Sequence, residues 1–119
     1  MPPSVFDPQR VVFGAMSKRS FYLREHIIKF VLEQGFTPTC AFMMYSYFLL
    51  DTVEREFLIR ANNELIRRSD ELWVFGPISD GVYKEIEFAR KLSMPVAFYS
   101  VSEDKKSFRE ITEKEAEVE

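Results

Sequence analysis

Residues 69–99 read SDELWVFGPISDGVYKEIEFARKLSMPVAFY and decide most of the fold. The apolar run Leu72–Phe75 predicts a buried strand, and the glycines, proline and serine of residues 76–81 predict the turn that ends it. A helical pattern covers Asp80–Leu92, and Pro95 precedes a second apolar strand at Val96–Val101. A strand, a turn with Ser and Gly, and a helix N-terminus in this order are typical of sites that bind a phosphate or a sugar.

The rest of the chain alternates strands and helices in the same way. Strands are expected at residues 10–15 and 36–41, the second at a sheet edge because it contains Pro38, and helices at residues 21–34 and 51–68. This alternation predicts an α/β fold with three layers, in which a Rossmann- or flavodoxin-like parallel sheet of four to five strands carries helices on both faces. The first and third strands should be adjacent at its centre. Residues 1–9 are expected to form a flexible lead, residues 10–101 the domain, and residues 102–119 a charged C-terminal tail that is either an exposed helix or frayed.

Composition excludes several classes of function. A chain of 119 residues with 46% hydrophobic content fits one domain with a real core, and a net charge of −3 offers no basic excess for a nucleic acid polymer. No run approaches the ~18 apolar residues that would indicate a membrane span, and no signal peptide is evident. The single Cys40 excludes an internal disulfide and fits a reducing compartment, so we expect a cytoplasmic protein. With one Cys and one His, no metal or other cofactor is expected.

The predicted topology indicates where a ligand would bind. Turns that follow neighbouring parallel strands open at the same edge of the sheet, so residues 14–19 and 76–81 should meet there. Asp70, Ser79, Gly81 and Glu85 are therefore expected to converge on one cleft with Gly14 and Ala15. Arg19 is a candidate contact for a phosphate.

Four motifs in fixed order add a resemblance to this interpretation. They are DELWVFG at residues 70–76, S-x-G at 79–81, E-I-E-x-A at 85–89 and P-V at 95–96. Together they resemble the nucleoside 2-deoxyribosyltransferase superfamily, which includes nucleotide N-glycosidases, and they are closest to an uncharacterised group within it. The resemblance extends more weakly back to Val11 and so covers most of the expected domain at residues 10–101.

The resemblance implies roles for three residues. Glu85 matches the helix glutamate that attacks the anomeric carbon, Asp70 matches the acid that holds or protonates the leaving base, and Ser79, six positions before Glu85, matches a phosphate-binding serine. The chain departs from the pattern at Glu87, which stands where the superfamily usually has a glycine. The further active-site residue that a neighbouring subunit usually supplies has no counterpart that we identify.

These observations predict an enzyme that processes the N-glycosidic bond of a nucleoside or nucleotide, of the N-glycosidase or 2-deoxyribosyltransferase type, with a glutamate nucleophile. Cleavage of such a bond passes through an oxocarbenium-like transition state, which a carboxylate stabilises or traps. The alternative is a non-catalytic nucleotide-binding or sensor module on the same fold. The Glu87 substitution favours the alternative, and the register of Glu85, Asp70 and Ser79 favours the enzyme.

Each site residue also has a plain structural interpretation, which the sequence leaves open. Glu85 is compatible with a solvated glutamate near a helix start, and Asp70 with a polar residue at the entry to a strand. Helix capping alone explains Ser79, a turn alone explains Gly81, and Arg19 resembles an isolated surface cation.

The aromatic stretch Phe42–Leu50 is too apolar to lie free in water. It either walls a base pocket or packs against a second copy of the chain, and we favour the second. The expected partners are therefore a small-molecule nucleoside or nucleotide and a homodimer or larger homo-oligomer, with no nucleic acid polymer and no membrane.

Overall fold

The computed structural model describes residues 4–41 and 47–119. Strands and helices alternate along most of this range, as the sequence predicts, and a charged C-terminal segment adds one more strand. The elements are β1 (Val11–Met16), η1 (Lys18–Leu23), α1 (Arg24–Glu33), β2 (Thr37–Thr39), α3 (Tyr47–Thr52), α4 (Arg55–Arg67), β3 (Glu71–Phe75), α5 (Asp80–Lys91), β4 (Val96–Val101), β5 (Phe108–Ile111) and η2 (Glu113–Glu115).

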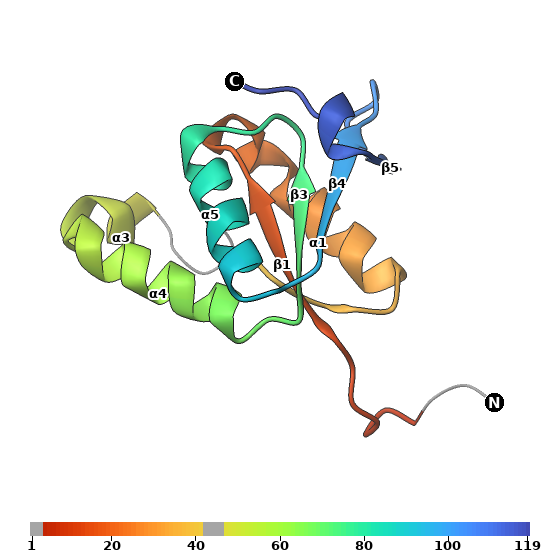
Figure 1. Cartoon of the computed structure of the whole chain (residues 1–119), viewed down its shortest axis with the longest axis horizontal. Helices are drawn as coiled ribbons and strands as arrows, with labels where there is room; N and C mark the ends of the chain where they lie inside the picture. The colour runs from red at the N-terminus through yellow and green to blue at the C-terminus, as the bar shows by residue number, and fades with distance from the viewer. Residues whose placement is uncertain (1–3, 42–46) are drawn as a thin grey trace.

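The five strands form one sheet in the order β2-β1-β3-β4-β5 (Figure 1). The parallel pairing of β1 with β3 confirms that the first and third strands are neighbours, and β2 with its Pro38 lies at an edge as expected. The expectation of an entirely parallel sheet is wrong, because β5 pairs antiparallel with β4. The six residues between β4 and β5 are too few for the crossover that a parallel neighbour needs, so they return the chain as a hairpin.

The charged segment 102–119 was expected to be an exposed helix or a frayed tail, and this expectation is wrong for residues 108–111, which form β5. Phe108 and Ile111 of β5 are partly buried against the sheet, whereas Arg109 and Glu110 are exposed. β5 is an edge strand with a neighbour on one side only, so two partly buried apolar residues are enough for it.

Helices cover both faces of the sheet (Figure 1). Because side chains alternate along a strand, Phe13, Leu72 and Val74 point toward α4 and α5, while Val12 and Phe75 point toward η1 and α1. An aromatic cluster lies on the α1 side of the sheet, where Phe75 and Tyr99 stack with ring centroids 5.1 Å apart. Burial there raises the pKa of Tyr99 to about 12. The aromatic residues of this cluster are Phe30, Phe36, Trp73, Phe75, Tyr99 and Phe108.

Two expected helices differ in detail from the sequence prediction. The helix expected from residue 21 begins as the 3-10 helix η1 and becomes α1 at Arg24. Gly35, with a φ of 86°, follows the end of α1. The helix expected at residues 51–68 is divided into α3 and α4. The aromatic stretch Phe42–Leu50 lies outside the described residues over positions 42–46, and α3 takes up the rest. No helix in the described ranges has both the length and the hydropathy that crossing a bilayer requires.

Gly76 directly follows β3 and has a φ of 78°, a conformation that residues with a Cβ atom adopt at a cost. A Cβ atom there would lie 3.4 Å from Ser20 Oγ and 3.6 Å from Val101 Cγ2. We expect Gly76→Ala to lower the free energy of unfolding by about 1–2 kcal/mol. Urea unfolding followed by the fluorescence of Trp73 measures this change.

Gly81 provides the matched control, because it lies in the first turn of α5 and a Cβ atom added there meets only Ser79 Oγ, at 3.9 Å. Gly81→Ala should be neutral or should stabilise the fold by up to about 1 kcal/mol. Equal destabilisation by the two substitutions would contradict the role assigned to the backbone of Gly76.

Candidate functional site

The turns after β1 and β3 lie side by side at the carboxyl edge of the sheet, because Met16 and Phe75 end these strands as register partners. In the first turn, Ser17 is buried and its Oγ accepts a hydrogen bond from Arg19 N. In the second, Ser79 Oγ accepts from Val82 N at 3.2 Å and caps α5. Ser79 therefore has the capping role that its sequence context permits, and it lies where a phosphate at the helix start would bind.

Residues 117–119 cross this edge. Ile78 N donates to Glu117 O at 2.8 Å, and Glu119 N donates to Ile78 O at 2.9 Å, so that Ile78 and Val118 form a short parallel bridge. The Glu119 carboxylate accepts a hydrogen bond from Ser17 Oγ at 2.6 Å and lies 3.7 Å from Arg19 Nε. The C-terminal segment thus joins the two turns that the sequence predicts to frame a site.

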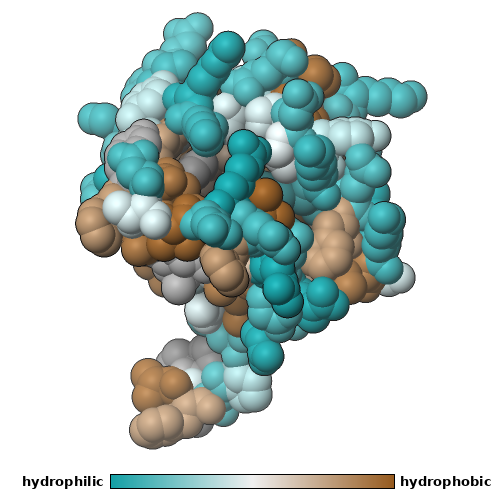
Figure 2. Space-filling view, turned by 90° about the vertical axis from the view of Figure 1, so that its left-hand side faces the viewer, coloured by the Kyte–Doolittle hydropathy of each residue, from teal (hydrophilic) through white to brown (hydrophobic). Residues whose placement is uncertain are grey.

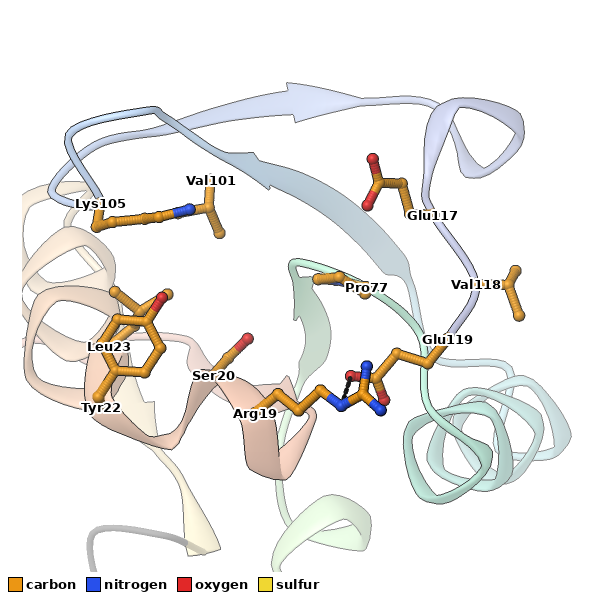
Figure 3. A pocket seen from close by; sticks show the side chains of 10 residues that line it. All are labelled: Arg19, Ser20, Tyr22, Leu23, Pro77, Val101, Lys105, Glu117, Val118 and Glu119. Carbon is orange, nitrogen blue, oxygen red and sulfur yellow. Dashed lines mark ion pairs between the residues drawn. The ribbon is translucent and has the colours of Figure 1, made fainter.

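A cavity of about 340 Å³ opens beside this segment (Figure 3). The side chains of Arg19 and Glu119 meet on one side of it, and Lys105 extends into it from the hairpin between β4 and β5 (Figure 3). Its lining therefore combines two cations with two carboxylates, those of Glu117 and Glu119. The lining residues are Arg19, Ser20, Tyr22, Leu23, Pro77, Val101, Lys105, Glu117, Val118 and Glu119.

Glu85 lies on the second turn of α5 and is partly buried. It is one turn from both Val82 and Ala89, two residues of the apolar stripe of α5, and its side chain reaches α4. Asn62 of α4 donates a hydrogen bond from Nδ2 to Glu85 Oε2 at 2.6 Å. Burial raises the pKa of Glu85 to about 7, and the hydrogen bond from Asn62 offsets this only in part. A carboxyl group that titrates near neutral pH is suited to acid, base or nucleophilic chemistry.

Asp70 lies at the opposite edge of the sheet. It directly precedes β3, where its backbone N–H donates to Val11 O and its Oδ2 accepts from Val11 N, both at 2.7 Å. Ser79 and Gly81 follow the other end of β3, and five residues of strand span about 16 Å. The structure therefore does not bring Asp70 together with Ser79 and Gly81.

The remaining predicted residues are divided between the core and the edge. Gly14 is interior to β1, and a Cβ atom there would lie 3.6 Å from Ile27 Cγ2, while Ala15 is buried on the α5 side of the sheet. Neither lines the 340 Å³ cavity, and neither does Glu85. Arg19 does, with its side chain largely exposed.

Sequence reasoning missed Asn62, Ser17 and Glu119. Asn62 had a usable signal, because it stands four residues before the buried Ile66 and so shares its face of α4. Glu119 had none, because an isolated acidic residue in a charged segment looks like any solvated one. Within residues 4–41 and 47–119, no group of three or more His, Cys, Asp or Glu side chains is placed to hold a metal ion.

The fold and these sites define a small α/β domain with polar turns at the carboxyl edge of four parallel strands and a partly buried glutamate on the following helix. Residues 13–99 match the family described as "Domain of unknown function (DUF7768)", and the chain belongs to this family. The match runs from β1 to β4 and includes Ser79 and Glu85; residues 117–119 lie beyond it. No curated protein matches the chain.

The raised pKa of Glu85 has a measurable consequence for stability. Because the folded protein disfavours the charged carboxylate, the stability should fall as the pH rises from 4.5, the ordinary value, to about 7. Glu85→Gln keeps an acceptor for Asn62 and removes the charge. We therefore expect this variant to be more stable than the wild type at pH 8 by about 1–3 kcal/mol, with little difference at pH 4.

Urea unfolding across this pH range measures the effect, and Glu87→Gln is the control, because Glu87 is an exposed carboxylate on the same helix. The curve for Glu87→Gln should run parallel to that of the wild type. If the curve for Glu85→Gln does so as well, Glu85 does not titrate near pH 7 in the folded protein.

Proposed function

We propose that the chain binds a nucleoside or nucleotide and cleaves or transfers its N-glycosidic bond, with the Glu85 carboxylate as nucleophile. The observation that carries the proposal is the partly buried Glu85–Asn62 pair, with its 2.6 Å hydrogen bond and a glutamate pKa of about 7. The pair lies one turn inside a helix that begins at the carboxyl edge of the parallel strands, where such sheets bind ligands.

The chemistry requires a fixed carboxylate beside the anomeric carbon. Asn62 holds one oxygen of Glu85, which restricts the orientation of the carboxylate and leaves the other oxygen to attack. Partial burial reduces hydration of the negative charge, so that the charge stabilises a developing oxocarbenium ion more strongly than it would in water. A phosphate on the substrate would bind at the start of α5, beside Ser79, about 9 Å along the helix axis from Glu85.

A second function is favoured by the position of Asp70. Departure of the base benefits from a second acid, but Asp70 lies at the far edge of the sheet, where its backbone N–H and its Oδ2 are bonded to Val11. If no other acid serves, the domain would bind a nucleotide without cleaving it. That is the non-catalytic nucleotide-binding or sensor module expected as the alternative.

We also propose that two copies of the chain associate through α3 and α4. Figure 2 shows brown apolar side chains among teal ones on the side that these helices form. A shallow hollow of about 490 Å³ runs along α4. The exposed apolar residues of these two helices are Phe48, Leu50, Phe57 and Ile59.

Incubation with a panel of nucleosides and nucleoside 5′-monophosphates, followed by chromatography of the free base, tests the enzymatic proposal. The rate of base release should rise with pH through about 7, because only the ionised form of Glu85 attacks. Glu85→Gln should abolish release and leave nucleotide binding measurable, and Glu87→Gln should retain release.

Ser79→Ala should weaken binding of the phosphorylated ligand by roughly 1–3 kcal/mol, as expected for a lost charge-assisted hydrogen bond. The unphosphorylated nucleoside should bind this variant as it binds the wild type.

Full activity of Glu85→Gln excludes Glu85 as nucleophile. Binding without release by the wild type selects the non-catalytic module.

Light scattering at micromolar concentration tests the association. The wild type should have the mass of a dimer or larger, and Phe57→Ser should shift the population toward monomer. Leu32→Ser is the control, because Leu32 is an equally exposed apolar residue on α1, at the other face of the sheet. A monomeric wild type contradicts the proposal.

A further inference from the structure

The segment 117–119 occupies the carboxyl edge of the sheet with few contacts. Its backbone is held by two hydrogen bonds, both to Ile78, and Val118 between them is 78% exposed. Within the described residues, no ladder with a neighbouring strand extends this single bridge. A segment held in this way can open without disturbing the sheet or the cores.

The side chain of Glu119 is held more closely than its backbone. It is only 16% exposed, and its carboxylate accepts from the buried hydroxyl of Ser17. The nearest cation, Arg19, is 3.7 Å away on a side chain that is 83% exposed. One hydroxyl and one distant guanidinium satisfy few of the lone pairs of a carboxylate. The position therefore favours an anion, but the Glu119 carboxylate makes few of the hydrogen bonds that it can accept.

The charged residues that line the cavity also favour an anion at this position. Glu117 and Glu119 balance Arg19 and Lys105 while the segment is in place. Departure of the segment removes these carboxylates, so that Arg19 and Lys105 remain on the cavity lining and the Ser17 hydroxyl loses its acceptor. A phosphate monoester, with about −1.5 to −2 charges and three acceptor oxygens, matches that arrangement better than a carboxylate does.

We propose that residues 117–119 are a displaceable strap. The Glu119 carboxylate holds the place of an anion between the two turns, and a ligand that carries a phosphate binds by expelling it (Figure 3). The strap thereby selects phosphorylated ligands over neutral ones. This inference rests on the proposed nucleotide-binding function only for the identity of the ligand.

The test compares the 119-residue wild type with Glu119→Ala and Glu119→Gln by calorimetric titration. The probes are inorganic phosphate, a nucleoside 5′-monophosphate and the corresponding nucleoside. If the strap is closed about 90% of the time, its loss should strengthen binding of both phosphate-bearing probes about tenfold and leave the nucleoside unchanged. Glu103→Ala removes a charge from the exposed turn before β5 and should change nothing.

Hydrogen exchange provides a second readout in the wild type. The Ile78 and Glu119 amides donate to the strap bridge, so saturating phosphate should accelerate exchange at Glu119. Tighter phosphate binding by Glu119→Ala together with no nucleotide binding would refute the proposed function and support the strap. Equal affinities in all variants, slower exchange at Glu119, or no binding of phosphate to any variant would overturn the strap.

Discussion

The parallel pairing of β1 with β3 is the constraint on which the rest of the structure depends. Both strands are apolar along most of their length because helices cover the sheet on both faces. The register from Val12–Glu71 to Met16–Phe75 fixes which side chains enter each core, and a slip of one residue would exchange the two sets. The same register aligns the ends of the strands, so the turns that follow them meet at one edge and α5 begins beside the first turn.

Two carboxylate side chains beside this sheet are partly shielded from water, each by different contacts. Glu85 is enclosed between two helices and faces a neutral amide, so burial raises its pKa. Glu119 lies on the peripheral segment 117–119, and its carboxylate faces the Ser17 hydroxyl with Arg19 beyond it. Glu85 is thus held by elements that cannot separate without loss of the core, whereas Glu119 is held by a contact that opens locally. The first arrangement suits a reactive group and the second a reversible gate.

Strong apolar periodicity predicts elements with nearly the right bounds. The strand expected at Val96–Val101 has those bounds in the structure, and the helix expected at Asp80–Leu92 ends one residue earlier. Where charge dominates, at β5 and at residues 117–119, the pattern does not predict the structure. A charged segment pairs with whatever edge the rest of the fold leaves open, and its own pattern does not show which edge that is. The separation of Asp70 from Ser79 has a similar cause: nine positions along the chain say nothing of distance when a strand lies between them.

By itself, the sequence determined that strands and helices alternate, that β1 and β3 are apolar enough to be interior, and that Ser79 caps a helix carrying Glu85. These features are local, because they follow from periodicity, turn residues and capping within a few positions. Only the tertiary structure decided that Asn62 faces Glu85 across 23 positions and that Glu119 reaches Ser17 across 102. Such contacts depend on how the helices and the last segment pack on the finished sheet. A local pattern can place Asn62 on the inner face of its helix, but it does not show which residue Asn62 meets there.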